Sequence, residues 1–201
     1  MARPIIALDA DGVLLDFHAG YANAWQRAFG VRPQERDPQA YWPMDRWAVQ
    51  RLDLEGRARF RRCFDAHFWS SLPAIDGALK ACVRLSEAGF ELVCVSALDA
   101  EFESARLGNL RALGFPIERV AATGHDEGAR SPKAGAIEAL RPVAFVDDYL
   151  PYLRGIPRSV HRALVLRAHN GSPNAGVDMA WASSLHDDLA GFTAHWLSPR
   201  R

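Results

Sequence analysis

Lysine is scarce in this chain of 201 residues, which contains only Lys80 and Lys133. Arginine supplies the other basic groups, and together they balance 24 acidic residues to a formal net charge of zero. This balance favours neither a nucleic-acid polymer nor an anionic membrane surface as a partner. No apolar run approaches the roughly 18 residues of a membrane span, and the first residues lack the pattern of a secretory signal. We therefore expect a cytoplasmic protein that contacts no membrane.

Cysteine is also scarce. Cys63, Cys82 and Cys94 are odd in number and have no CxxC spacing. They are therefore expected to be small core residues in a reducing compartment rather than metal or redox groups.

The histidines show no i, i+4 pair suited to zinc. We expect them to be structural or surface residues, and His18 is the one exception to consider because it follows Asp16 and Phe17 near the expected site. The full set is His18, His67, His125, His161, His169, His186 and His195.

Short apolar segments alternate with helical stretches along most of the chain. Parallel strands rich in Val, Ile, Leu and Ala are expected at residues 5–9, 91–96, 119–122, 143–147 and 163–167. Helices are expected at residues 76–88, 100–113, 132–140 and about 184–196. Gly89 and Gly114 would end the first two, and Ser131 with Pro132 would start the third. The pattern predicts an α/β fold, a Rossmann-like three-layer sandwich with a mostly parallel sheet.

Residues 17–72 interrupt this alternation, because they show helical spacing and no strand pattern. Aromatic residues recur at that spacing in two series: Phe17, Tyr21 and Trp25, then Phe60, Phe64 and Phe68. We expect an inserted helical cap over the carboxyl ends of the strands, with residues 1–16 and 73–201 forming the α/β core domain. Most of its aromatic side chains should form the cap's own small core.

Asp9 and Asp11 stand at the end of the first expected strand, where open α/β sheets place their ligand sites. Their side chains would point to opposite faces of a regular strand, but Gly12 permits a sharp turn that brings both to one point. Two adjacent carboxylates repel, so they indicate a bound cation or a shared proton. An EF-hand loop fails as an alternative, because its glycine stands sixth and Gly12 would stand fourth.

Three further signals lie at strand or helix ends. Ser96, with the backbone N–H of Ala97, could hold a phosphate oxygen after the second strand. Lys133 lies in the first turn of an expected helix, where a positive charge is unfavourable and so suggests another duty. Asp147 and Asp148 end a buried strand, where paired carboxylates are costly without a cation or hydrogen-bond donors.

The order Asp9-Ala10-Asp11-Gly12, Ser96, Lys133 and Asp147-Asp148 resembles the four motifs of the haloacid dehalogenase-like superfamily of phosphotransferases. The resemblance covers residues 5 to about 170, and that superfamily places its smaller helical cap between the first two motifs. It implies a phosphatase, or a phosphomutase that uses the same acid and base, because dehalogenases lack the aspartate matching Asp11 and the superfamily's ATPases have threonine there.

The resemblance implies hydrolysis of a small phosphorylated substrate with Mg²⁺. Asp9 would be the nucleophile and form an aspartyl-phosphate, and Asp11 would be the acid and base. Ser96, Ala97 and Lys133 would bind the phosphate. The metal would be held by Asp9, the Asp11 backbone carbonyl, and Asp147 or Asp148, a choice that the sequence leaves open.

The flanking sequence resembles the 5′(3′)-deoxyribonucleotidase group, in Asp-Gly-Val-Leu-Leu-Asp-Phe, Phe-Trp-Ser-Ser-Leu-Pro and Ala-Leu-Val-Leu-Arg-Ala-His-Asn. In that group the aromatic residue matching Phe17 packs against the nucleobase. The group has Ser-Pro where Ala97 follows Ser96 here, which leaves nucleotide specificity open. Arginines such as Arg46 or Arg51 would be available for a second anionic group. Candidate selectors of the substrate are Phe17, Trp42, Trp47 and Trp69.

Two alternatives remain at this stage. A sugar phosphomutase of the same superfamily would use the same acid and base, release no net phosphate and need a bisphosphate activator. A binding protein that retained the fold is less favoured, because all four motif positions hold chemically competent residues. Neither the oligomeric state nor the pathway can be read from one chain.

Overall fold

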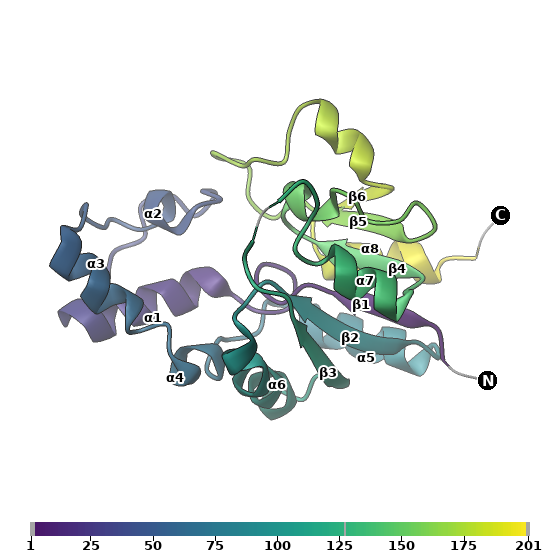
Figure 1. The fold of residues 1–201 in the computed structure, drawn as a ribbon, viewed down its shortest axis with the longest axis horizontal. Helices are drawn as coiled ribbons and strands as arrows, with labels where there is room; N and C mark the ends of the chain where they lie inside the picture. The colour runs from purple at the N-terminus through teal and green to yellow at the C-terminus, as the bar shows by residue number, and fades with distance from the viewer. Residues whose placement is uncertain (1–2, 127, 200–201) are drawn as a thin grey trace.

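Six parallel strands form one sheet at the centre of the molecule (Figure 1). The computed structural model describes residues 3–126 and 128–199. The strand order is β3-β2-β1-β4-β5-β6. The bounds are β1 Ile5–Leu8, β2 Glu91–Ser96, β3 Ile117–Ala122, β4 Ala144–Asp147, β5 His161–Val165 and β6 Ser184–His186. The fold class predicted from the sequence, an α/β sandwich around a parallel sheet, is confirmed.

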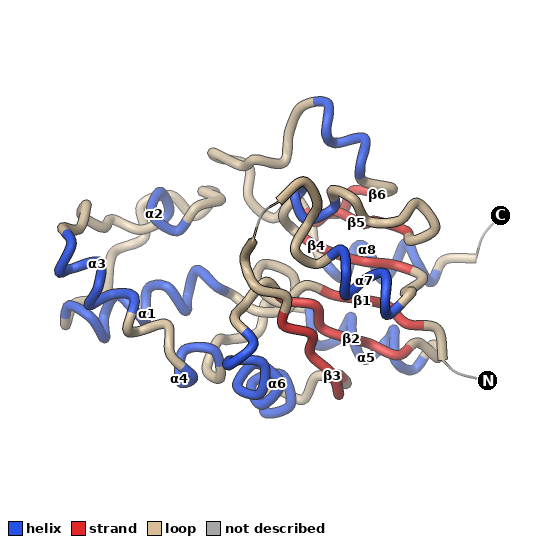
Figure 2. Tube along the Cα trace, viewed as in Figure 1, coloured by secondary structure: helices blue, strands red, loops and turns tan. Residues whose placement is uncertain are grey.

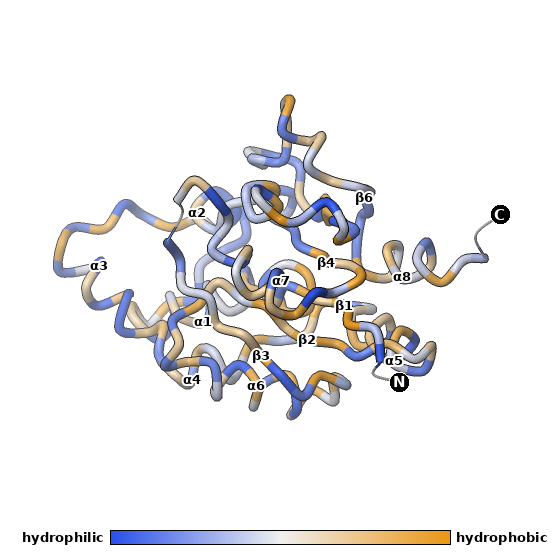
Figure 3. The backbone as a smooth tube through the Cα atoms, turned by 45° about the vertical axis from the view of Figure 1, so that its right-hand side comes forward, coloured by the Kyte–Doolittle hydropathy of each residue, from blue (hydrophilic) through white to orange (hydrophobic). Residues whose placement is uncertain are grey.

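Helices cover both faces of the sheet (Figure 2). One apolar cluster joins Ile6 and Leu8 of β1 to α5 (Ala78–Glu87), α6 (Glu103–Ala112) and α8 (Leu189–Leu197). The other joins Ala7 of β1 to α7 (Ala134–Leu140) and to the 3₁₀ turns η2 (Leu150–Leu153) and η3 (Val177–Trp181). Because successive side chains of a strand point to opposite faces, a strand buried on both faces must be apolar throughout. The apolar colour along β2 in Figure 3 follows this rule.

The C-terminal segment differs from the sequence-based expectation. Residues 184–196 were expected to form one helix, but Ser184–His186 form strand β6, parallel to β5, and α8 starts only at Leu189. Asp188 separates the two, because its carboxylate accepts a hydrogen bond from Gly191 N at 2.6 Å and so caps α8. Three residues carry too little periodic pattern to identify an edge strand from the sequence.

Two other strands are shifted along the chain. β3 starts at Ile117, two residues before its expected start, and β5 spans His161–Val165 rather than residues 163–167. The register pairs Ala144 of β4 with His161. Arg167 therefore lies beyond the end of β5, where its side chain is free to reach neighbouring loops.

Residues 17–72, called the insert below, leave the core after β1 and return before α5. The insert contains α1 (Phe17–Phe29), α2 (Pro43–Arg46), α3 (Leu54–Arg61) and α4 (Ala66–Trp69), joined by irregular loops. In Figure 1 these helices lie beyond the carboxyl ends of the strands. The two chain connections run side by side, because Ile75 N donates to Leu14 O at 2.9 Å and Asp16 N donates to Pro73 O at 2.8 Å.

Aromatic rings pack against one another through the interior of the insert. The ring centroid of Phe60 lies 5.0 Å from that of Tyr21 and 5.4 Å from that of Trp25, both in edge-to-face arrangements. The ring centroids of Phe64 and Phe68 lie 4.6 Å apart. Such pairs are stabilising beyond the area they bury. The expected aromatic core of this segment is therefore present in the structure.

None of the helices in the described residues is long and apolar enough to cross a membrane. Cys63, Cys82 and Cys94 are buried free thiols, as expected of small core residues.

The cap of α8 can be tested by substitution. Asp188→Ala should lower the free energy of unfolding by about 1 kcal/mol, because the N-terminal amide of Gly191 loses its acceptor. Urea unfolding measures this, with exposed Asp187→Ala as the matched control that should change stability by less than about 0.5 kcal/mol. If the helix instead began near residue 184, Asp188 would lie inside it and alanine would stabilise the protein.

Candidate active site

Three carboxylates meet at the carboxyl ends of neighbouring strands. Asp9 directly follows β1, Asp147 is the last residue of β4, and Asp148 comes next. Because β1 and β4 pair in parallel, their ends lie side by side, and Asp9 N donates to Val146 O at 2.9 Å. One oxygen from each carboxylate lies within 4.8 Å of the others, and all three residues are buried. Oxygen-rich clusters of this kind suit hard divalent cations.

Lys133 provides the positive charge inside this cluster. Its Nζ donates to Asp9 Oδ1 at 2.5 Å and to Asp147 Oδ2 at 2.6 Å, and the side chain is fully buried. Burial opposes the charged ammonium, but the two carboxylates outweigh it and hold the pKa of Lys133 above its usual value. Lys133 immediately precedes α7 instead of lying inside its first turn, and its backbone N–H donates to Ser131 Oγ at 3.1 Å.

The two consecutive aspartates have different surroundings. Asp147 uses both oxygens within the protein, because Oδ1 accepts from Tyr149 N at 2.9 Å and Oδ2 accepts from Lys133. Asp148 lines a cavity, and its Oδ2 accepts from Arg167 Nε at 2.6 Å. Asp148 is therefore the one of the pair that faces the cavity.

The carboxylates of the site outnumber its cations. Asp9, Asp11, Asp147 and Asp148 stand against Lys133, Arg106 and Arg167, which leaves one excess negative charge. Burial raises the pKa of Asp148 to about 6, against the lowering effect of Arg167, and it raises the pKa of Asp147 well above its usual value against Lys133. A bound cation would lower both pKa values, because its positive charge favours the ionised carboxylates.

A glycine turn brings Asp11 to the same place. Gly12 has φ +89°, and Leu14 N and Leu15 N both donate to Ala10 O at 2.8 Å. A Cβ atom at Gly12 would overlap Asp148 Oδ2 and lie 2.5 Å from Arg167 Nε. Position 12 therefore needs glycine both for its backbone angle and for the close approach of Asp148.

Arg106 holds the carboxylate of Asp11. Its Nη2 donates to Oδ1 at 2.9 Å and Oδ2 at 2.8 Å, and the guanidinium lies 5.0 Å from the centre of the Trp69 ring. Arg106 is fully buried on α6, whereas Asp11 is partly exposed to the cavity. Burial raises the pKa of Asp11 although Arg106 opposes this, and the charge of Asp9 raises it further.

Sequence reasoning did not identify Arg106. A signal was present, since Phe102, Arg106 and Leu110 follow one another at intervals of four and place the arginine on the apolar stripe of α6. Arg167 was named only as the end of an expected strand, and its contact with Asp148 depends on the corrected end of β5.

Of the three expected phosphate-binding residues, Ser96 and Ala97 lie at the end of β2, whereas Lys133 precedes α7, and only Ala97 lines the cavity described below. The Ser96 hydroxyl is buried and has no hydrogen-bond partner among the described residues. Ala97, the next residue, lines the cavity beside Asp9 and Asp11. A buried hydroxyl without a partner is costly, so it indicates a group that another molecule can satisfy.

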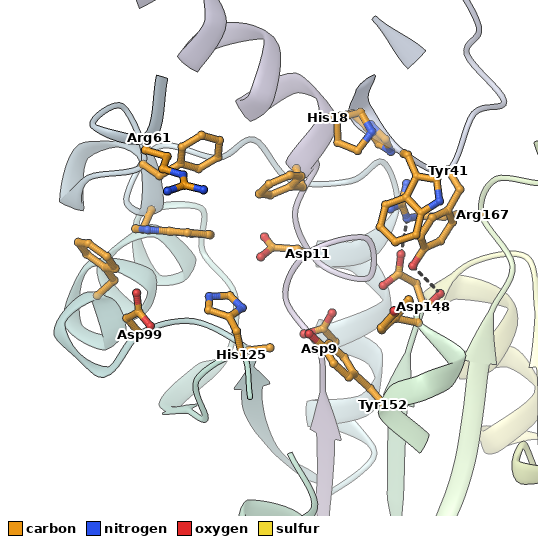
Figure 4. Close-up of a pocket in the computed structure, with 18 residues that line it drawn as sticks. Asp9, Asp11, His18, Tyr41, Arg61, Asp99, His125, Asp148, Tyr152 and Arg167 are labelled. Atoms are coloured by element: carbon orange, nitrogen blue, oxygen red, sulfur yellow. Dashed lines mark hydrogen bonds and ion pairs between the residues drawn. The ribbon is translucent and has the colours of Figure 1, made fainter. Parts of the chain in front are cut away.

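A cavity of about 630 Å³ opens between the carboxylates and the insert (Figure 4). Of the expected selectors, Phe17, Trp42 and Trp69 line it. Trp47 does not, because it is buried in the core and its Nε1 donates to His18 O at 3.0 Å. The lining residues that the sequence did not suggest include Tyr41, Arg61, Phe64, Asp99, Phe102, His125, Tyr149 and Tyr152.

One histidine and the two expected arginines are placed differently from the prediction. His18 and His125 both line the cavity, although His125 was expected to be a structural or surface residue. Arg46 and Arg51 do not line it. Arg46 forms an ion pair with Glu35 at 2.7 Å, so its charge is already used within the insert.

Comparison with solved structures identifies the architecture. The fold is that of the haloacid dehalogenase superfamily. The L-2-haloacid dehalogenase of Xanthobacter autotrophicus matches with a TM-score of 0.60 and 15% identity, over 98% of this chain and 100% of that chain. A HAD family hydrolase from Deinococcus radiodurans, solved with bound phosphate and sodium, matches with a TM-score of 0.60 and 16% identity over 96% and 95%. A predicted phosphoglycolate phosphatase from Haemophilus somnus matches with a TM-score of 0.63 and 14% identity over 96% and 98%.

No family model and no curated protein matches the chain. The solved structures have different activities in their names, so the shared fold does not decide between them. The buried cluster of Asp9, Asp147 and Asp148 could hold a metal ion.

The two lysines allow a direct test of the buried ion pairs. Lys133→Met should lower the free energy of unfolding by about 3–5 kcal/mol without added metal, because two buried carboxylates lose their partner. Lys80→Met, on the exposed side of α5, should change it by less than about 0.5 kcal/mol. Urea unfolding in the presence of a chelator compares the two, and equal effects would contradict the bridging role of Lys133.

The close approach at Gly12 gives a second test. Gly12→Ala should destabilise the protein and reduce its stabilisation by Mg²⁺, because the new methyl group displaces Asp148. Gly135→Ala is the matched control, since it lies within α7 with open space around it and should raise stability by up to about 1 kcal/mol. Thermal unfolding with and without Mg²⁺ separates these outcomes. If Gly12→Ala kept its stabilisation by Mg²⁺, Asp148 would not be part of the metal site.

Proposed function

We propose that the protein is a Mg²⁺-dependent phosphomonoester hydrolase that acts on a small phosphorylated metabolite through an aspartyl-phosphate. The observation that carries the proposal is the position of Asp11, a carboxyl group of raised pKa that faces the same cavity as Asp9 and is held by a buried arginine. An alkoxide leaving group needs a proton, and this carboxyl can supply it. A halide leaves without one, so the arrangement favours phosphate-ester hydrolysis over dehalogenation.

Asp9 is the proposed nucleophile. Lys133 holds Oδ1 by a 2.5 Å hydrogen bond, and the other oxygen is available for attack on phosphorus. As the Asp9–phosphorus bond forms, the bond from phosphorus to the alcohol oxygen breaks, and that oxygen takes the proton of Asp11. Asp11 then removes a proton from the water that attacks the aspartyl-phosphate and releases inorganic phosphate.

The donor set fits Mg²⁺, which takes carboxylate and carbonyl oxygens. Asp9, Asp148 and the backbone carbonyl of Asp11 would hold it, while Asp147 would support Lys133, because both of its oxygens already have partners. When bound, the cation neutralises the phosphoryl oxygens and lowers their repulsion from Asp9. Ser96 Oγ and the backbone N–H of Ala97 would donate to the phosphoryl oxygens.

The insert is the proposed cap. Its residues Phe17, Trp42, Phe64 and Trp69 form much of the cavity wall opposite the carboxylates, so it can exclude water and contact the alcohol part of the substrate. The sequence resemblance keeps a deoxynucleoside or nucleoside monophosphate among the substrates to be tested. The aromatic wall would suit such a ring but does not require one.

The decisive experiment is phosphate release from a panel of phosphomonoesters with Mg²⁺, comprising deoxynucleotides, ribonucleotides, sugar phosphates, phosphoglycolate and phenyl phosphate. Asp9→Asn should abolish turnover, and Asp11→Asn should reduce hydrolysis of alkyl esters by roughly 10²–10⁴-fold. Exposed Asp178→Asn in η3 is the control and should retain turnover.

Turnover that persists in Asp9→Asn would contradict the role of Asp9 as the nucleophile. Absence of turnover on every ester, with the protein folded and stabilised by Mg²⁺, would contradict the hydrolase. Interconversion of sugar phosphates without net phosphate release, dependent on a bisphosphate, would indicate a mutase instead.

A further inference from the structure

His18 is a buried polar residue that the proposed chemistry does not use. It lies in the first turn of α1, which Asp16 caps by accepting from Ala19 N at 3.0 Å. Only 3% of the residue is exposed, and neither ring nitrogen has a hydrogen-bond partner among the described residues. Leaving buried donors or acceptors unsatisfied costs about 1–3 kcal/mol. The ring can therefore gain a hydrogen bond from a molecule that enters the cavity.

His18 lies at the wall of the cavity. His18 lines it together with Tyr41 and Trp42, and in Figure 4 it lies on the insert side of the cavity, across from Asp9. Its backbone carbonyl accepts from Trp47 Nε1 at 3.0 Å, which fixes the first turn of α1 against the rest of the insert. The backbone that carries the imidazole is therefore anchored, and the residue is buried, which limits the movement of the ring.

Burial, more than the surrounding charges, favours the neutral form of this imidazole. Burial lowers the pKa of His18 to about 4, and the nearby charges of Arg167 and Arg46 act in the same direction, with Asp16 opposing them. A neutral imidazole offers one donor and one acceptor. An uncharged polar group such as a hydroxyl or an amide, which both donates and accepts, matches this ring, and the neutral ring offers no positive charge to an anion.

The charges of the cavity wall disfavour a second anion. Asp9, Asp11, Asp99 and Asp148 line the cavity, whereas the only arginines among the described lining residues are Arg61 and Arg167. Arg167 is already paired with Asp148, and Arg61 is exposed. The remaining wall is largely aromatic. A leaving group that carries a second phosphate or carboxylate would find little compensation here.

We propose that His18 hydrogen-bonds an uncharged hydroxyl or amide group on the alcohol part of the substrate, and so selects neutral polar alcohols over alcohols that carry a second anion. The inference rests on the proposed hydrolase activity and names the substrate class of the same site. His18 makes this contact before and during phosphoryl transfer, so its loss should raise KM more than it lowers kcat.

The test uses ester pairs that differ by one hydroxyl group: ribose 5-phosphate with 2-deoxyribose 5-phosphate, and 3-hydroxypropyl phosphate with n-propyl phosphate. The measured quantity is the ratio of the two kcat/KM values within a pair, which cancels a general loss of activity. In wild type the hydroxylated ester of at least one pair should be preferred, and phosphoglycolate should be a poor substrate. His18→Phe should reduce that preference roughly tenfold, which is the loss of about one hydrogen bond.

His18→Gln retains a donor and an acceptor and should restore much of the preference, whereas a purely structural role would not distinguish glutamine from phenylalanine. His67→Phe, on an exposed part of α4, is the matched control and should leave the ratio unchanged. If His18→Phe does not fold, the same comparison is made with His18→Leu.

A ratio that stays the same in the phenylalanine or leucine variant, or a wild-type enzyme that prefers no hydroxylated ester, would overturn the role of His18. Preference for phosphoglycolate would do the same. Phenyl phosphate distinguishes a failure of the proposed His18 contact from a failure of the proposed hydrolase activity, because it carries no second polar group. Its Mg²⁺-dependent hydrolysis by wild type would leave the proposed function standing, and its absence together with no turnover of the other esters would contradict that function.

Discussion

The site depends on one buried lysine held between two carboxylates. Lys133 reaches from the start of α7 to Asp9 after β1 and Asp147 at the end of β4. Without it, the three carboxylates buried at neighbouring strand ends would repel one another with no cation to offset the repulsion. Asp147 is hydrogen-bonded to Lys133 within the protein, whereas Asp9 and Asp148 line the cavity. The lysine therefore both stabilises the cluster and decides which carboxylates can meet a ligand.

A second pair of charges connects the core to the insert. Arg106 on α6 holds Asp11 and lies over the ring of Trp69, the last residue of α4. On the other side, Tyr41 of the insert donates its hydroxyl to Asp148 O at 3.2 Å. Both walls of the cavity thus contact residues at the strand ends. The position of the insert and the geometry of the carboxylates should consequently change together rather than independently.

The same fold serves different reactions in the solved structures it resembles, so the chemistry must be argued from side chains. Here the informative feature is a difference between two aspartates two residues apart. Asp9 is paired with a buried ammonium, whereas burial raises the pKa of Asp11 despite its arginine. Two carboxyl groups in such different surroundings can divide the roles of nucleophile and acid, as the proposed function requires. His18, whose ring nitrogens have no partner among the described residues, is the residue that we propose selects the alcohol.

The sequence alone determined the alternation of strands and helices, the aromatic insert, and the placement of Asp9, Ser96 and Asp147 at strand ends, because these follow from local periodicity and from turn residues such as Gly12. It could not place β6, since three residues at a sheet edge show no reliable period. Only the tertiary structure decided that Arg106 meets Asp11, that Trp47 is buried instead of facing the cavity, and that His18 faces the cavity unpartnered. Each of these depends on contacts between segments far apart in the chain, which spacing along a sequence does not specify.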